Sequence, residues 1–245
     1  MANERHTDYR GWDVDSSTRQ SVHPANRYVA ISNAASTTAE DVYSIVVNGG
    51  EIATNLVLNP GVEGSTVDEF VATGSARSRS TAQAAEGSAS LLINPDNSAA
   101  GEGFYWESEL VSRSVNTQYI SVQLEVRGAS ASGAVTLTLR DSGGTTLHGT
   151  SGSHNLTTGF VKLSATYAIP ANTDAAKYRL YLVTTAQHNI DFYADKIMFE
   201  IREDTTAVST YVDGNQTGGE GPLYEWTGVA NASSSIKKPS LTKIK

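Results

Sequence analysis

Between residues 70 and 201 the chain is divided into short segments in which apolar and polar side chains alternate, separated by Gly, Asn and Asp. The clearest is 119–127, where four aliphatic residues alternate with Ser, Gln and Glu. Side chains two positions apart in a β-strand lie on the same side of a sheet, so each segment can bury one face. Many short strands joined by tight turns are typical of a β-sandwich. We therefore predict an all-β fold.

Eight segments are expected to form strands: 70–74, 90–93, 103–110, 119–127, 135–139, 160–169, 178–183 and 190–201. The residues between them include Asn94-Pro95-Asp96-Asn97 and Asp141-Ser142-Gly143-Gly144, which are typical of turns. The nearest approach to a helical pattern, 81–87, is too short to predict a helix.

The composition excludes several classes of protein. The chain has 245 residues, a formal net charge of −8 and a pI near 5.1, which disfavours binding to a nucleic-acid backbone. It contains no cysteine, so disulfides, thiolate zinc sites and cysteine nucleophiles are excluded. We find no apolar run long enough for a membrane helix and expect no secretory leader in the polar start of the chain.

Three parts are expected along the chain. Residues 1–53 would form an assembly arm and a β-hairpin, in which 41–47 pairs with 51–58 across Asn-Gly-Gly. Residues 54–203 would form the sandwich. Residues 204–245 would form an aromatic extension with a basic tail, which either stays in solvent or docks on an acidic neighbour.

Five motifs in order resemble the strands of carbohydrate-binding-module-like jelly rolls. They are Asn55–Glu63 (NLVLNPGVE), Gly87–Leu91 (GSASL), Tyr119–Val122 (YISV), Phe160–Leu163 (FVKL) and Phe192–Ile197 (FYADKI). The resemblance spans about residues 54–201. It implies a jelly-roll β-sandwich of the group that includes xylan- and glucan-binding modules.

The end of the chain is similar to a segment that follows such modules in minor tail proteins of tailed bacteriophages. This similarity rests on Thr210–Gln216 (TYVDGNQ), Tyr224–Gly228 (YEWTG) and Asn231–Ser235 (NASSS). It implies a structural virion protein, either a minor tail or a decoration protein, assembled in the cytoplasm of a host bacterium. Its partners would be other virion proteins, further copies of itself and a host-surface polysaccharide, with no nucleic acid and no membrane insertion.

Catalytic residues are not apparent in the pattern. The five histidines form no metal-binding pair at helical spacing, and no nucleophile motif is present. Glu107 and Glu109 lie on one side of an expected strand, whereas glycoside hydrolysis needs two carboxylates that face each other across a sugar. We therefore predict a protein that is not an enzyme.

Sugar sites combine an aromatic platform with polar side chains. On the strand Phe104-Tyr105-Trp106, either Tyr105 faces solvent with Trp106 in the core, or the reverse holds. Tyr119, Gln123 and Arg127 share the polar side of 119–127. These five residues, Tyr105, Trp106, Tyr119, Gln123 and Arg127, are the glycan-binding candidates.

The jelly-roll resemblance also implies a structural calcium ion that joins the first and last strands. The matching ligands are Glu63 and Asp195, since calcium prefers oxygen donors. Alternatively, Asp195 caps a turn or pairs with Lys196 or Arg202.

Four aromatic side chains outside the expected sandwich are candidate assembly anchors: Trp12, Tyr211, Tyr224 and Trp226. Aromatic residues in polar segments order on a partner or fold back on their own domain. We thus predict a phage structural protein that displays a sandwich and adheres weakly to glycans. The alternative is a free, non-catalytic carbohydrate-binding module.

Overall fold

The computed structural model describes residues 53–203, 208–216 and 223–238, and strands at 5–7, 13–15, 26–32, 42–48 and 241–244. Contacts within the chain divide it into two compact units. The larger unit consists of Ala53–Gln216 and Tyr224–Lys237, and the smaller one contains both ends of the chain.

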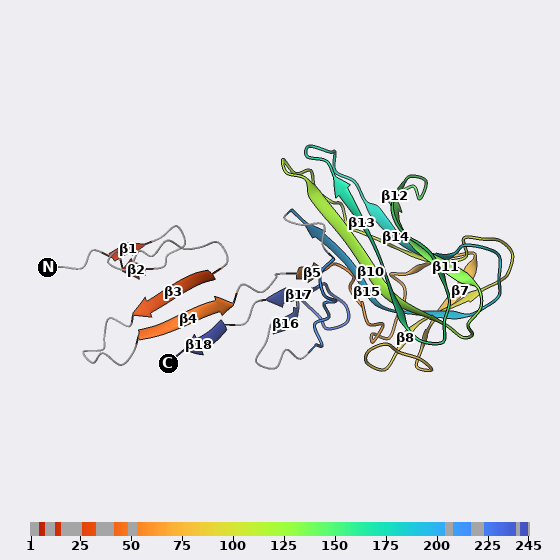
Figure 1. Cartoon of the computed structure of the whole chain (residues 1–245), viewed down its shortest axis with the longest axis horizontal. Coiled ribbons are helices and arrows are strands. Elements are labelled where there is room, and N and C mark those ends of the chain that lie inside the picture. Colours follow the sequence, from red (N-terminus) through yellow and green to blue (C-terminus); the bar gives the residue numbers. More distant parts are fainter. Residues whose placement is uncertain are drawn as a thin grey trace. The chain divides into compact units, whose positions relative to one another are not determined.

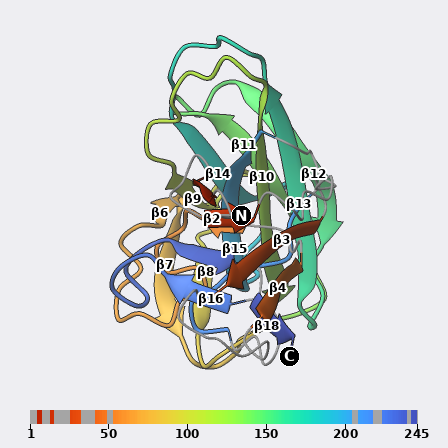
Figure 2. The same ribbon diagram turned by 90° about the vertical axis from the view of Figure 1, so that its left-hand side faces the viewer.

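The larger unit is built on two antiparallel sheets that pack face to face (Figure 1). The strands of the first sheet are, in spatial order, β13 (Val161–Ile169), β10 (Gln118–Gly128), β15 (Phe192–Arg202), β8 (Ser90–Pro95) and β7 (Ser75–Ser80). Those of the second sheet are β12 (Leu147–Asn155), β11 (Ala134–Asp141), β14 (Tyr178–Thr184), β9 (Gly103–Glu107) and β6 (Val71–Thr73). Figure 2 gives a second view of these sheets.

This architecture confirms the predicted all-β jelly-roll sandwich. The described residues contain no helix, and therefore none that is long and apolar enough to cross a membrane. The alternating aliphatic residues that predicted the strand 119–127 line the core, because Ile120, Val122 and Leu124 are all buried between the sheets. Phe70 packs edge-on against Phe104, with ring centroids 5.5 Å apart. Each such buried side chain stabilises the fold by about 1.5–3 kcal/mol.

A third, small sheet lies against the outside of the first sheet. It has the order β16 (Leu223–Trp226), β17 (Ser235–Lys238) and β5 (Ala53–Asn55). Its apolar contacts form a second cluster around Ala53, Met198 and Val212, on which Tyr211 and Tyr224 pack. The segment 208–216 thus folds back on the sandwich of its own chain.

Asn55 joins β5, β15 and this returning segment. Its side chain is fully buried. The amide nitrogen donates to the carbonyl oxygens of Ile197 at 2.9 Å and Val212 at 3.0 Å. The amide oxygen accepts from the backbone N–H groups of Val57 at 3.1 Å and Phe199 at 3.2 Å. One side chain therefore satisfies four backbone groups from three parts of the chain.

The smaller unit contains a three-stranded sheet of β18 (Leu241–Ile244), β4 (Val42–Asn48) and β3 (Asn26–Ser32). Strands β1 (Arg5–Thr7) and β2 (Asp13–Asp15) form a separate antiparallel pair.

Two expectations for the chain ends are wrong. The neighbours of β4 are β3 and β18, so 41–47 does not pair with 51–58. The residues after the Asn-Gly-Gly sequence instead form β5, which pairs with β17 and is held there by Asn55. The tail is also not left in solvent along its length, because Leu241–Ile244 pairs with β4.

Replacing Asn55 with Ala should lower the free energy of unfolding by about 3–5 kcal/mol, since four hydrogen bonds are lost and the backbone groups stay buried. Urea denaturation followed by tryptophan fluorescence measures this change. Asn116→Ala is the control, because this exposed asparagine bonds to Glu203 at the surface and should cost less than about 1 kcal/mol. Equal losses in the two variants would contradict the role assigned to Asn55.

Candidate functional site

Two tyrosines lie side by side on the outer face of the second sheet. Tyr105 in β9 and Tyr181 in β14 are direct cross-strand partners. Their ring centroids are 5.1 Å apart and the ring planes are inclined by 39°. Their strand neighbours Phe104, Trp106 and Leu180 point inward and are buried, so alternation turns both tyrosines toward solvent. The two half-buried rings form an aromatic platform.

Two arginines are held against this platform. The guanidinium of Arg179 lies 4.4 Å from the centroid of the Tyr105 ring, and that of Arg140 lies 5.7 Å from the centroid of Tyr181. Cation–π contacts at these distances keep long side chains flat on an aromatic surface. Arg179 also donates from Nε to Oε2 of Glu107 at 2.7 Å. We call these five residues (Tyr105, Tyr181, Arg140, Arg179 and Glu107) the tyrosine–arginine face.

The turn between β11 and β12 borders this face. Gly144 has a φ of +72°, and a Cβ atom at this position would lie 2.5 Å from the hydroxyl of Tyr181. Arg140 donates from Nη1 to the carbonyl oxygen of Gly144 at 3.0 Å. Hydrogen bonds from Thr146 and Thr145 lower the pKa of Asp141 to about 2. The turn is therefore fixed by an ionised carboxylate and brings its backbone against the tyrosine.

The structure places Tyr105 on this face and Trp106 in the core. Trp106 is only 5% exposed, stacks on Phe199 with centroids 5.1 Å apart and donates from Nε1 to Glu69. A ligand at the surface cannot reach it. Of the two alternatives left open by the sequence, the one with Tyr105 outward is therefore the observed one.

The other three glycan-binding candidates lie on the first sheet, away from Tyr105. Gln123 is 2% exposed and donates to the carbonyl oxygen of Ser209, so the returning segment covers it. Arg127 lies near the rings of Phe160 and Tyr193, 5.8 and 5.9 Å from their centroids. Tyr119 is half-buried at the other end of β10. The exposed members of the predicted set are thus divided between two faces, and its two buried members, Trp106 and Gln123, are unavailable to a ligand.

Tyr181, Arg179 and Arg140 were not among the residues predicted from the sequence to bind a glycan. The signal was present in 178–183, because Leu180 and Leu182 point into the core and so place Arg179 and Tyr181 on the opposite side. Pairing of β14 with β9, which brings Tyr181 beside Tyr105, is not visible in either segment alone.

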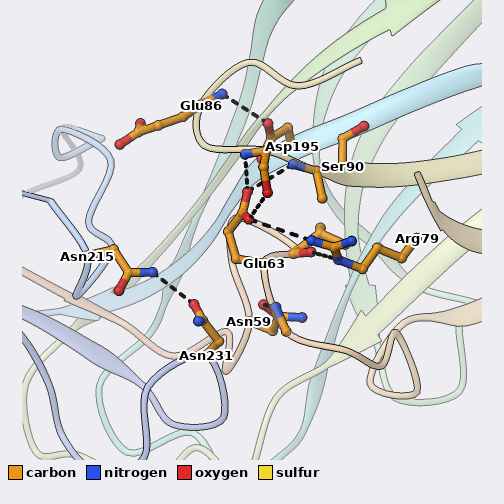
Figure 3. A network of polar contacts seen from close by, with 12 residues as sticks. Asn59, Glu63, Arg79, Glu86, Ser90, Asp195, Asn215 and Asn231 are labelled. Carbon is orange, nitrogen blue, oxygen red and sulfur yellow. Dashed lines mark hydrogen bonds and ion pairs between the residues drawn. The ribbon is translucent and has the colours of Figure 1, made fainter. Parts of the chain in front are cut away.

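The two candidate calcium ligands are neighbours at another place in the larger unit (Figure 3). Glu63 accepts hydrogen bonds on Oε1 from the backbone N–H groups of Ser88 at 2.6 Å and Ala89 at 2.9 Å. Its Oε2 also lies 3.6 Å from Nη2 of Arg79. Burial alone would raise the pKa of Glu63, but these hydrogen bonds and the arginine lower it below its usual value.

Asp195 is fully buried and accepts three backbone hydrogen bonds. The donors are the N–H groups of Ala85 at 2.7 Å, Glu86 at 3.1 Å and Lys196 at 2.7 Å. Burial nevertheless raises its pKa to about 7, and the negative charge of Glu63 adds to the increase. Asp195 therefore does cap a turn, as one of the alternatives expected.

A hollow of about 500 Å³ opens beside Glu63. Its lining combines carboxylate and amide side chains with two glycines: Gly61, Glu63, Glu86, Gly87, Ser88, Asp213, Asn215 and Asn231. These oxygen donors suit calcium by type. Among the described residues no three acidic or histidine side chains converge on one point. Glu63 and Asp195 would thus hold calcium only together with backbone oxygens or waters. The ion would neutralise the negative charges of these two carboxylates, which come from distant segments of the chain.

Three of the four candidate anchors fold back onto their own chain, and Trp12 lies outside the described residues. Tyr211 donates to Oδ2 of Asp213 at 3.1 Å. Tyr224 packs on the second apolar cluster. Trp226 donates from Nε1 to Oδ1 of Asn215 at 3.1 Å, and its ring lies over Gly214, where a Cβ atom would come within 2.5 Å of it.

No known family model matches this sequence, and no curated protein matches it. Solved structures similar in fold include the CBM22-1 xylan-binding domain of Xyn10C from Paenibacillus barcinonensis. It is 21% identical, with a TM-score of 0.44, covering 64% of this chain and 100% of the domain.

Enzymes of similar fold are also found. A Stig cyclase from Fischerella sp. TAU is 12% identical with a TM-score of 0.48, covering 63% of this chain and 100% of the cyclase. The α-L-arabinofuranosidase MgGH51 is 16% identical with a TM-score of 0.45, covering 63% of this chain and 27% of the enzyme. At these identities and scores the likenesses assign neither a family nor a ligand, and they give no link to tailed bacteriophages.

The raised pKa of Asp195 predicts that the fold loses stability as the pH rises. Because the folded state binds this proton more tightly than the unfolded chain, the free energy of unfolding should fall between about pH 5 and about pH 7. Glu102 and Asp141, whose pKa values are lowered to about 2, titrate below this range.

Urea denaturation at several pH values within this range tests the prediction. Asp195→Asn should flatten the dependence, whereas the control Asp174→Asn, which changes an aspartate whose side chain is 97% exposed, should leave it unchanged. An Asp195→Asn variant with the same slope as the original protein would show that this carboxyl group does not titrate there.

Proposed function

We propose that this protein is a non-catalytic glycan-binding protein whose tyrosine–arginine face holds a saccharide. The observation that carries the proposal is the pair of adjacent tyrosine rings, Tyr105 and Tyr181, turned to solvent between two ordered arginines. Sugars present flat C–H surfaces and a rim of hydroxyl groups, which such a platform with charged neighbours complements.

Each part of the face has a separate role in this mechanism. A pyranose ring would stack on Tyr181 or Tyr105, which excludes water from one side of the sugar. The guanidinium groups of Arg140 and Arg179 would donate to its oxygens, and Glu107 would accept from a hydroxyl group. The residues are already ordered by contacts with one another, so little conformational entropy is lost on binding.

The carboxylate on this face favours binding over hydrolysis. Glu107 is engaged by Arg179 at 2.7 Å and by Lys177 at 3.6 Å. Glycosidases use two carboxyl groups about 5–9.5 Å apart on either side of the scissile bond. The nearby Asp141 is committed to the backbone of its own turn, so it does not supply the second group.

Loss of either tyrosine should weaken glycan binding at least about tenfold, since a stacked ring contributes roughly 1.4 kcal/mol or more. Affinity electrophoresis would measure Tyr105→Ala and Tyr181→Ala against xylan, mixed-linkage β-glucan, galactomannan, alginate and polygalacturonate. Tyr193→Ala is the matched control, because this half-buried tyrosine lies on the first sheet. Retention of none of these polysaccharides by the original protein, or an equal loss in Tyr193→Ala, would refute the proposal.

A second candidate function is that of a structural component of a tailed-phage particle, displaying the sandwich toward the host. The smaller unit supports it, because strands from both ends of the chain form a module beyond what a binding sandwich needs. Immunogold labelling of purified particles tests this function. Labelled particles are expected, and particles that carry no label would rule it out while leaving glycan binding intact.

A further inference from the structure

The tyrosine–arginine face has an unusual row of charges. Arg140 in β11 lies directly opposite Arg179 in β14, and Arg179 lies directly opposite Glu107 in β9. Side chains in such positions have Cβ atoms about 4.5–5.5 Å apart, and like charges placed there destabilise a sheet. The sheet therefore accommodates a repulsive arginine pair on its exposed face, near one end of β11 and β14.

The neighbouring charges do not balance this pair. Lys177 also lies 3.6 Å from Oε1 of Glu107, so Arg179 and Lys177 share the single carboxylate of this row. The carboxylate of Asp141, at the end of β11, accepts from the N–H groups of Thr145 and Thr146 in the turn. The row thus has a local excess of positive charge in a chain whose net charge is −8.

Both arginines keep donors for a ligand. A guanidinium has five N–H donors. Arg140 uses Nε for Thr138 and Nη1 for Gly144, at 3.3 and 3.0 Å. Arg179 uses Nε for Glu107 and Nη1 for the hydroxyl of Tyr181, at 2.7 and 3.4 Å. The Nη2 groups are the natural donors to an incoming anion, and arginine binds carboxylates through paired N–H groups.

We propose that the saccharide bound by this face is acidic, and that its carboxylate lies between Arg140 and Arg179 while a sugar ring stacks on the tyrosines. This inference rests on the proposed glycan-binding function and narrows it to polysaccharides that contain uronic acid or similar carboxylate-bearing residues. A carboxylate at this place relieves the repulsion of the arginine pair, which a neutral sugar cannot do.

The acidity of the whole chain does not oppose such a ligand. At physiological ionic strength charges are screened over about 8 Å, so a bound carboxylate responds to the groups around it and not to the total charge. Half-buried guanidinium groups against aromatic rings are also less hydrated than free ones, which strengthens their contact with an anion.

The test compares acidic polysaccharides with neutral forms of the same chains. Alginate and polygalacturonate, each beside its carboxyl-reduced derivative, and dextran sulfate as a general polyanion are the probes, measured by affinity electrophoresis. At least one acidic chain should bind about tenfold or more tightly than its reduced form, the gain of one charge-assisted contact. The preference should fall between about 20 mM and about 150 mM salt.

Variants of the arginines locate the effect. Arg140→Gln and Arg179→Gln should each weaken binding of the acidic chain by a larger factor than binding of its reduced form, and so remove most of the preference, because only the acidic chain loses a charge-assisted contact. Arg179→Lys keeps the charge without the paired donors and should retain part of the preference. Arg113→Gln is the control, because this arginine is 58% exposed in a loop outside the face. Thermal unfolding confirms that each variant is folded.

Each outcome separates this inference from the function on which it rests. Equal binding of acidic and reduced chains, both weakened by Tyr181→Ala, would overturn the acidic preference and keep glycan binding. Retention of none of the probes would overturn both. Dextran sulfate bound as tightly as the uronic chains, or an acidic preference that survives both glutamine variants, would show general attraction of anions and overturn the inference.

Discussion

The larger unit depends on the four hydrogen bonds of the buried Asn55 amide. They join the first strand of the unit to β15 and to the returning segment at Val212, which lie more than a hundred residues away in the chain. No apolar side chain could replace it, because the backbone groups that it satisfies would stay buried without partners. The same returning segment covers Gln123, and its Val212 packs with Ala53 and Met198 on the outside of the first sheet.

The central strands of the sandwich were predictable because apolar and polar residues alternate along them, as in 119–127. Two of the four edge strands, β7 and β12, were not predicted. β7 (Ser75–Ser80) and β12 (Leu147–Asn155) consist mostly of Ser, Gly, Thr, Arg and His, and a strand with one neighbour needs less apolar surface to stay paired. The expected hairpin after β4 failed for a related reason. The Asn-Gly-Gly sequence indicates only a local turn, whereas β4 and β5 each pair with a strand from a distant part of the chain, β18 and β17.

The candidate site was predictable in part. The alternation of side chains along 104–106 allowed either Tyr105 or Trp106 to face solvent. The packing of Trp106 on Phe199 shows that Trp106 is in the core and Tyr105 faces outward. The partners of Tyr105 come from β14 and β11, so their contribution depends on strand order, which one sequence does not contain. Calcium at Glu63 and Asp195 stays a prediction, since the observed hydrogen bonds account for both carboxylates without an ion.

The course of the chain through its two units has a consequence for biosynthesis. The sheet of β3 and β4 receives its third strand, β18, from a segment that follows the whole sandwich in the sequence. That sheet can therefore be completed only after the sandwich has been translated, and the sandwich is free to fold first as an independent module. A truncated chain that lacks the final strand would keep the binding module and leave β4 with an unpaired edge, which is a template for association with another chain.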